Sequence, residues 1–487
     1  MELAKLLGVA AYLAVLVGIG VVASRRMKDL SDYFVAGKKL SFFSVAFSAR
    51  ATGESAWLLL GLTGMGAAVG IKAFWVVLGE LIGVAGAWIL MARPFKQATD
   101  LSNAITVPDY LEARFDDTSH RLRLVAAFAL TVFVTIYVSA QIDATGKAFE
   151  SFLGWDYFVG AIVGFTVVLA YITTGGFLAV AWSDVFQGAL MVVGLVVLPV
   201  AGFWAAGGPG PVFAGLEAID PALMSWTGGA GITAVSVAEI LGLALIGLGF
   251  LGSPQIFVRF IALRDVSEIR QGTWVAIAWT LLADSGAVLV GLAGRHLIGV
   301  SGEEVLPALV EHLFPAVLVG LYIAIVLSAI MSTVDSLLVL AGSAAVRDYY
   351  QQVRNPDIPD ADLVGLSRKV TFGLAVAALG IAMAVAVATP DRTIFWFVIF
   401  GWSGIAATFC PVMILSLAWP GMQRDGAMAS MIAGFLSVPF FKFVAPGLPM
   451  VGDVLAAMGE LPPSFAVAFV AGIVGSMWSG GARASVA

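Results

Sequence analysis

The fold of this chain is decided by the stretch from Phe47 to Trp57, which reads FSARATGESAW. It lies inside an apolar segment, yet it carries small, polar and charged residues where a lipid-facing helix would carry leucine. A glycine with hydroxyl neighbours lets a helix unwind in mid-membrane, and the freed carbonyls replace the hydration shell of a small cation. A tight helix crossing at small residues has the same composition. The charges of Arg50 and Glu54 favour the interrupted helix.

The composition around this stretch is that of an integral membrane protein. Of 487 residues, 60% are apolar and only 12% are charged. The net charge of -6 does not suggest nucleic-acid binding. A single cysteine, Cys410, excludes an intramolecular disulfide framework, and the three histidines show no metal-ligand spacing. No nucleophile, base and phosphate loop converge, so we expect no catalytic residues and no enzyme.

Apolar segments long enough to cross a bilayer predict an all-α fold with about 13 transmembrane helices, because backbone groups in lipid must be satisfied within a helix. The expected spans are 5–24, 42–68, 73–92, 122–146, 157–175, 178–206, 233–252, 272–297, 315–346, 367–388, 393–418, 427–446 and 463–481.

The spans group into one transporter domain, 1–487, built on two repeats of five helices. The first repeat is 42–206 and the second is 233–418, separated by a Gly/Pro-rich outer loop over 207–233. An odd number of helices per repeat makes the second repeat enter the membrane inverted. Span 5–24 is a retained peripheral helix rather than a removed signal peptide, and 427–481 adds two more helices.

Positive charge orients the spans. Most of the 26 Lys and Arg residues, Arg259 among them, fall on the cytoplasmic side if the N-terminus lies outside. We therefore expect a multi-pass protein of the inner (plasma) membrane with a cytoplasmic C-terminus.

Two further stretches match the first. Gly247 to Pro254 (GLGFLGSP) places three glycines and a proline near the end of the seventh span. Interruptions at corresponding positions of two halves point to a transporter binding site, although a proline-terminated helix reads the same way. In the ninth span, Ser332 and Thr333 supply adjacent hydroxyls that, with the Ala329 carbonyl, suit a hard cation. Such hydroxyls also bond back to their own helix.

Arg50 and Glu54 are four residues apart and share one helix face. One interpretation is an internal ion pair, and the other has Arg50 binding a substrate carboxylate with Glu54 as its gate. Further acids lie within or near the spans, each either a second cation or proton site or a capped helix end: Glu80, Asp143, Asp184, Glu239, Asp284 and Asp335.

Several ordered motifs resemble the sodium:solute symporter family, and within it most of all the sodium/proline symporters. The resemblance runs over nearly the whole chain and is carried by Ser31 to Lys38, Thr106 to Phe115, Gly175 to Asp184 with Gln187, Gly247 to Pro254, and Met331 to Thr333.

The resemblance implies a LeuT-type core with sodium bound between its first and eighth helices. The implied sodium ligands are the carbonyls of Ala51, Glu54 and Ala329 and the hydroxyls of Ser332 and Thr333. A possible second sodium lies near Asp184, with Asp335 and Ser336. The substrate candidates are Arg50, Thr52, Gly53, Ser55, Trp57, Tyr137, Gln141, Phe250, Ser253, Pro254 and Trp402.

This chain departs from the proline symporters where the substrate is expected. They carry aspartate at the position of Gly53, glycine at Arg50, tryptophan at Ile246 and tyrosine at Phe250. The sodium-site hydroxyls are retained, whereas the identity of the solute stays open.

The expected function is sodium-coupled symport of a small organic solute, with proline or a related amino acid as the first candidate. Sodium is the coupling ion, and the bilayer is the surrounding medium. We expect no nucleic-acid partner and no obligatory protein partner. The rivals are a proton-coupled carrier that uses Glu54 or Asp184 as relay, and a transporter-like sensor, which a chain ending at Ala487 soon after its last span does not favour.

Overall fold

The computed structural model describes residues 2–25, 35–172 and 176–484. Ser31 to Phe34 and Gly175, which belong to the quoted motifs, lie outside the described residues.

The described chain is helical, and its only bridge between extended segments joins Leu40 to Leu263. The helices of the first half are α1 (Glu2–Ser24), α3 (Phe42–Ala56), α4 (Thr63–Val69), α5 (Phe74–Gly86), α6 (Ala92–Leu101), α7 (Val107–Phe115), α8 (Arg121–Leu153), α9 (Tyr157–Ile172), α10 (Gly176–Ala205) and α11 (Pro209–Ile219). Those of the second half are α12 (Ala234–Ala244), α13 (Pro254–Ala262), α14 (Ile269–Ile298), α15 (Val305–Leu313), α16 (Ala316–Ser343), α17 (Asp360–Ala388), α18 (Ile394–Ala418), α19 (Arg424–Pro439), α20 (Gly452–Met458) and α21 (Leu461–Ala484).

Short 3₁₀ and π segments join many of these helices. They are η1 (Ala36–Lys38), η2 (Trp57–Leu62), η3 (Gly70–Ala73), η4 (Ala87–Met91), η5 (Pro221–Met224), η6 (Ile246–Leu251), η7 (Val266–Glu268), η8 (Ala344–Arg354), η9 (Phe440–Val444) and η10 (Ala445–Gly447).

Among the described residues, 11 helical runs are long and apolar enough to cross a membrane. One of them, Phe42–Leu101, has 60 residues and would be about 90 Å long if straight, several times the hydrocarbon thickness. It turns back at Gly70, which caps α4 with a φ of 66° that glycine adopts without strain. The described part of α9 gives only the shorter run Tyr157–Val167. The count of 13 spans therefore stays a prediction.

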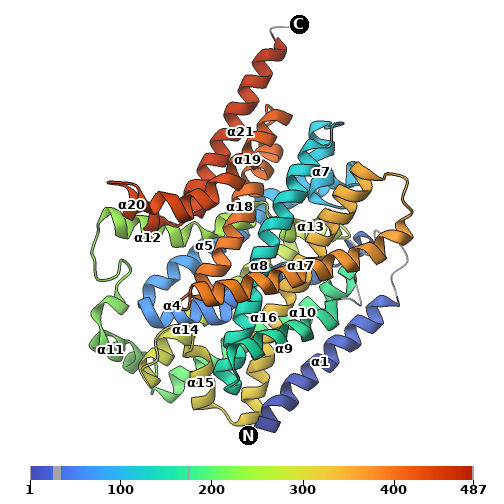
Figure 1. Ribbon diagram of the computed structural model, residues 1–487. Helices are drawn as coiled ribbons and strands as arrows, with labels where there is room; N and C mark the ends of the chain where they lie inside the picture. The colour runs from blue at the N-terminus through green and yellow to red at the C-terminus, as the bar shows by residue number, and fades with distance from the viewer. Residues whose placement is uncertain (1, 26–34, 173–175, 485–487) are drawn as a thin grey trace.

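Helix α3 lies at the centre of the bundle. It packs against α10, α13, α14 and α16, while α8 packs on α16, α17 and α18. Figure 1 shows α1 along the outside of the bundle, and α19 and α21 projecting at the end where the C-terminus lies. The predicted outer loop over 207–233 is partly helical, since it contains α11 and η5.

The motif from Thr106 to Phe115 forms the start of a helix, and a cluster of ion pairs surrounds that start. Thr106 and Asp109 make a reciprocal capping box at the start of α7. The Asp109 carboxylate also pairs with Arg123 of α8 at 2.8 Å and with Arg347 of η8 at 3.1 Å. Burial raises the pKa of Asp109, but Arg347 and Arg123 outweigh it, so the pKa lies below its ordinary value. This cluster ties three elements together at one end of the bundle.

Candidate functional site

The helix that carries the deciding stretch breaks at Ser55. Ser41 caps the start of α3, because its side chain accepts a hydrogen bond from the backbone of Ser44. Helical geometry holds until Ser55, whose φ of 45° and ψ of -166° lie in a region that side-chain-bearing residues rarely adopt. The chain then continues as the π-helix η2. The interruption lies two residues beyond the glycine, Gly53, that predicts it.

A second interruption separates α12 from α13. The 3₁₀ segment η6 is followed by Ser253, whose hydroxyl donates to the Gly249 carbonyl at 2.5 Å, and by Pro254 in the first turn of α13. Proline suits this position because its missing N–H has no helical partner to lose. A Cβ on Gly247 would lie 1.9 Å from the Gly79 carbonyl oxygen, so only glycine allows η6 to approach α5 this closely.

The predicted hydroxyls of α16 meet the carbonyls of α3 just before the break. The Ser332 hydroxyl lies 3.0 Å from the Ala51 carbonyl and 3.2 Å from that of Ala329. The Thr333 hydroxyl lies 3.1 Å from the carbonyls of both Thr52 and Ala329. All five residues are buried. Neutral oxygens at this density are the ligands that a hard cation prefers.

Two details of this cluster differ from the prediction. The Glu54 carbonyl accepts the Trp57 amide, so it is engaged within its own helix here. The Thr52 carbonyl was not predicted, yet it contacts Thr333. Ser332 contacts the Ala51 carbonyl, and the next residue, Thr333, contacts the next carbonyl, that of Thr52. The two adjacent hydroxyls could therefore have predicted two adjacent carbonyl partners.

Next to this cluster, a guanidinium lies among the residues predicted for a second sodium. Arg259 of α13 donates to the Asp184 carboxylate at 3.2 Å and to the Ser336 hydroxyl at 2.5 Å. It also donates to the Thr52 hydroxyl at 2.6 Å and to the Ser48 hydroxyl at 3.0 Å. Ser48 in turn donates to Asp184 at 2.6 Å. This set of residues is named the Arg259 network below.

The Arg259 network corrects one expectation. Arg259 was expected among the cytoplasmic loop charges, but its side chain is 1% exposed. Its position within the apolar stretch from Gln255 to Ala262 was the missed signal. Asp335 joins the edge of the network, since one of its oxygens accepts the Ser336 hydroxyl at 3.3 Å.

Arg50 and Glu54 form the ion pair that their spacing predicts, on the face of α3 toward α5 and α14. The guanidinium also lies 3.6 Å from Glu80 of α5. It stands over two rings, with centroids at 4.7 Å for Phe250 and 5.5 Å for Trp279. In this structure Arg50 therefore faces protein acids rather than an open substrate position.

A third acid completes this group. One oxygen each of Glu54, Glu80 and Asp284 lies within 4.8 Å of the others, and all three residues are buried. Two like charges at that separation repel by about 3.5 kcal/mol at an effective dielectric constant of about 20. These three carboxylates are named the acid cluster below. The sequence analysis named Glu80 and Asp284 without linking either to Arg50.

Two of the other acids have simple partners. Asp143 pairs with Arg392 and accepts the Tyr157 hydroxyl at 2.6 Å. Glu239 pairs with Lys72 at 2.5 Å. Both are balanced ion pairs, which weakens the case for either as a coupling site.

Three predicted substrate residues meet at the break in α3. The Ser55 hydroxyl accepts Gln141 Nε2 at 3.3 Å and the Tyr137 hydroxyl at 3.4 Å. The Gln141 side-chain oxygen accepts the Ala56 amide at 3.1 Å. Helix α8 thus presents two side chains to the irregular backbone of α3.

The aromatic candidates gather beside this group. The rings of Phe250 and Trp402 lie 4.9 Å apart, and Gly53 packs on Phe250. Trp57 Nε1 donates to the Gly53 carbonyl at 3.2 Å. The sulfur of Cys410 lies 3.2 Å from the Gly249 carbonyl and 3.7 Å from the Ser253 hydroxyl.

The predicted substrate residues thus fall into separate groups. Ser253 and Pro254 shape the start of α13, and the Thr52 side chain belongs to the Arg259 network rather than to the aromatic group.

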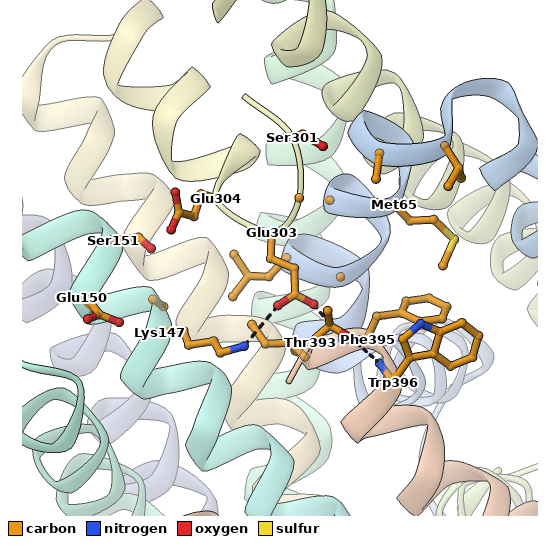
Figure 2. Close-up of a pocket in the computed structure, with 18 of the residues that line it drawn as sticks. Met65, Lys147, Glu150, Ser151, Ser301, Glu303, Glu304, Thr393, Phe395 and Trp396 are labelled. Atoms are coloured by element: carbon orange, nitrogen blue, oxygen red, sulfur yellow. Dashed lines mark hydrogen bonds and ion pairs between the residues drawn. The ribbon is translucent and has the colours of Figure 1, made fainter. Parts of the chain in front are cut away.

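A cavity of about 600 Å³ lies between η2, α4, α8, the loop before α15 and the start of α18. In Figure 2, Glu303 reaches across it to two partners. Its carboxylate lies 3.4 Å from Lys147 of α8 and accepts the Phe395 amide at 2.9 Å. The Phe395 ring packs edge-on against Trp57 at 6.1 Å. Phe395 lines the cavity, and its contact with Trp57 joins the cavity wall to the start of η2, just after the break at Ser55.

The sequence matches one protein family over most of its length: residues 33–434 match the profile of the sodium:solute symporter family. The high-affinity proline transporter PutP of Bacillus subtilis is 37% identical over 427 residues, which are 86% of this chain and 88% of that one. The osmoregulated proline transporter OpuE of the same organism is 33% identical and covers 98% and 95%. The sodium/proline symporter of Escherichia coli is 32% identical and covers 88% and 86%.

Solved structures show the same fold. A substrate-bound, outward-open Na⁺-coupled sialic acid symporter superposes with a TM-score of 0.79 at 19% identity, covering 98% of this chain and 97% of that one. MhsT in complex with L-phenylalanine gives 0.53 at 15% identity, covering 89% and 99%. The LeuT-type architecture is therefore confirmed.

Proposed function

This chain belongs to the sodium:solute symporter family, and from that premise we propose that it imports proline or a closely related amino acid together with sodium. It is a multi-pass membrane transporter that couples sodium to the movement of a solute, and it is not an enzyme. Three relatives that align over most of the chain are named as proline transporters.

The observation that carries the sodium site is the contact between α16 and α3. Ser332 and Thr333 reach the Ala51 and Thr52 carbonyls, within four residues of the break at Ser55. A sodium ion here is bound by oxygens of both helices, so its binding energy fixes the irregular backbone where the solute binds. Ions and solute then raise each other's affinity, as linkage requires.

The solute position is the space around the break, bounded by Ser55, Tyr137, Gln141, Phe250 and Trp402. Irregular backbone and hydroxyl or amide side chains suit the ammonium and carboxylate groups of an amino acid. The aromatic rings suit a small apolar ring such as that of proline.

Alternating access follows from what lies on either side of that position. The Phe395–Trp57 contact separates it from the 600 Å³ cavity, which we assign to the outer side. The Arg259 network links α3, α10, α13 and α16 on the other side. Each closure must open in turn. A membrane potential of about 100 mV adds about 2.3 kcal/mol per sodium charge carried inward.

The organisation that goes with this function is one transporter domain in the plasma membrane, with the N-terminus outside and the C-terminus inside. Repeats 42–206 and 233–418 form the core, and segments 5–24 and 427–481 flank it. We propose that it works with no obligatory protein partner.

Uptake into proteoliposomes tests the function. Labelled proline should accumulate with an inward sodium gradient and not with an inward potassium gradient, and other amino acids at excess should compete according to their similarity to proline. Uptake that ignores sodium and follows an inward pH gradient would contradict the proposal and favour a proton-coupled carrier, for which the acid cluster would be the relay.

A further inference from the structure

The acid cluster holds more negative charge than the protein around it balances. Glu54, Glu80 and Asp284 come from three helices, α3, α5 and α14, and none is more than 1% exposed. Arg50 is the one cation that the structure pairs with them among the described residues. Ionised carboxylates in a membrane interior need partners, so one guanidinium for three acids leaves a deficit.

The hydrogen bonds of these carboxylates are also incomplete. Within the described part of the chain, both oxygens of Asp284 and one of Glu80 accept no hydrogen bond, whereas Glu54 is in contact with Arg50. Asp284 makes no ion pair with a described residue either, although it is fully buried and one of its oxygens points into the cluster. Buried polar groups of native proteins are almost always satisfied, so the vacant lone pairs indicate a ligand.

The geometry limits that ligand to a small, hard cation. The three oxygens lie within 4.8 Å of one another, close enough to be bridged by one ion that binds oxygens at about 2.4 Å. Carboxylate oxygens select hard cations such as sodium over soft metals. The rings of Phe250 and Trp279 cover the guanidinium of Arg50, so the space around the cluster is filled by protein rather than open to a solute.

We propose that the acid cluster is a second sodium site, distinct from the hydroxyl site at Ser332 and Thr333. Arg50 balances one carboxylate, the ion balances a second, and the third carries a proton, because an unpaired carboxylate is neutralised when buried. The two sites flank α3 on opposite sides near the break at Ser55, one toward α16 and one toward α5 and α14. The inference rests on the proposed function, since it concerns how many sodium ions that function uses and where they bind.

Sodium titrations of thermal stability test the site without transport. The purified full chain in nanodiscs is melted in choline chloride with increasing NaCl at constant ionic strength. Ser332→Ala/Thr333→Ala should keep part of the sodium-dependent rise in melting temperature, and adding Asp284→Asn should abolish the rest. Asp284→Asn is nearly isosteric and removes a buried charge, so it should fold. Glu80→Gln provides the same test at a second position. Glu460→Gln, a buried acid paired with Lys442 away from the core, is the matched control.

A double Ser332/Thr333 variant without any sodium response would overturn the proposal, as would a response that Asp284→Asn leaves intact. Stabilisation by micromolar calcium, or by acid without sodium, in place of sodium would assign the cluster to another cation and overturn it too. Potassium should have no effect.

Transport gives the second readout. The Hill coefficient for sodium in wild-type proline uptake should be between one and two, and should fall to about one in Asp284→Asn. A coefficient of one in both proteins, with uptake still driven by sodium, would reject the second site alone. Absence of sodium-driven uptake in the wild type would instead reject the proposed function.

Discussion

Two buried arginines flank the proposed sodium site at Ser332 and Thr333 in opposite ways. Arg259 meets one carboxylate and has hydroxyls or a carbonyl at its remaining nitrogens. Arg50 meets two carboxylates of the acid cluster and stands over the rings of Phe250 and Trp279. A guanidinium with an acceptor at each nitrogen and one carboxylate partner holds one arrangement of helices, whereas Arg50 faces more carboxylates than its single charge balances. We therefore interpret Arg259 as a contact that holds helices together and Arg50 as part of the proposed second sodium site.

The largest effect should come from breaking the Arg259 network. Arg259→Ala leaves Asp184 buried and unpaired, which should cost about 3–5 kcal/mol. Melting in detergent should show the loss, and Asp184→Asn added to Arg259→Ala should restore most of it because it removes the stranded charge. Failure of that rescue would mean that Arg259 acts through its other partners.

The same pair of substitutions, loss of the arginine and neutralisation of an acid partner, should give a different result at Arg50. Arg50→Ala should cost about 2–3 kcal/mol, from its ion pair and its ring contacts. No single neutralisation should rescue it, because more than one acid remains. Glu80→Gln in the Arg50→Ala background should therefore recover less than half of the loss. Full recovery would show that Arg50 and Glu80 form a simple pair like that of Arg259 and Asp184.

The neutral oxygens between the two arginines should determine sodium affinity. Ser332→Ala/Thr333→Ala should raise the half-saturating sodium concentration for uptake by about 10- to 100-fold, since hydrogen-bonding groups that face a charge are worth about 1.5–3 kcal/mol. Ser328→Ala is the matched control, because its hydroxyl donates to Ala324 of the same helix at 2.8 Å. An equal shift in the control would place the effect in the helix rather than in the site.

The charge cluster around Asp109, which contains neither of these arginines, should show the smallest effect. Asp109→Asn should lower stability at pH 7 by about 1 kcal/mol, since the paired carboxylate has a lowered pKa. Stability from such a group is present above the unfolded pKa of about 3.9 and is lost as the pH falls through the lower folded value. The difference between variant and wild type should therefore begin to shrink near about pH 3.9 and disappear only below the lower folded pKa. Exposed Asp453→Asn should show no such difference.

The fold and the contact of Ser332 and Thr333 with α3 were predictable because each depends on local sequence. Apolar runs mark helices, and a glycine among hydroxyls marks an interruption. Ser332 and Thr333 are adjacent, so the only further information needed to predict their partners was that α3 packs against α16. The arginine sites were not predictable in the same way. Arg259 and Asp184 are 75 residues apart, and the acid cluster joins three helices whose rotation about their axes no sequence pattern fixes.

The single cysteine of the chain, Cys410, can serve as a chemical probe of conformational opening. Cys410 is fully buried between α18 and η6, where it touches the backbone of the second interruption. A maleimide can react with Cys410 only while α18 and η6 are separated. The labelling rate therefore measures how often these two elements move apart. No cysteine needs to be removed or introduced, so the labelling rate of the unmodified protein can be compared with and without sodium and solute.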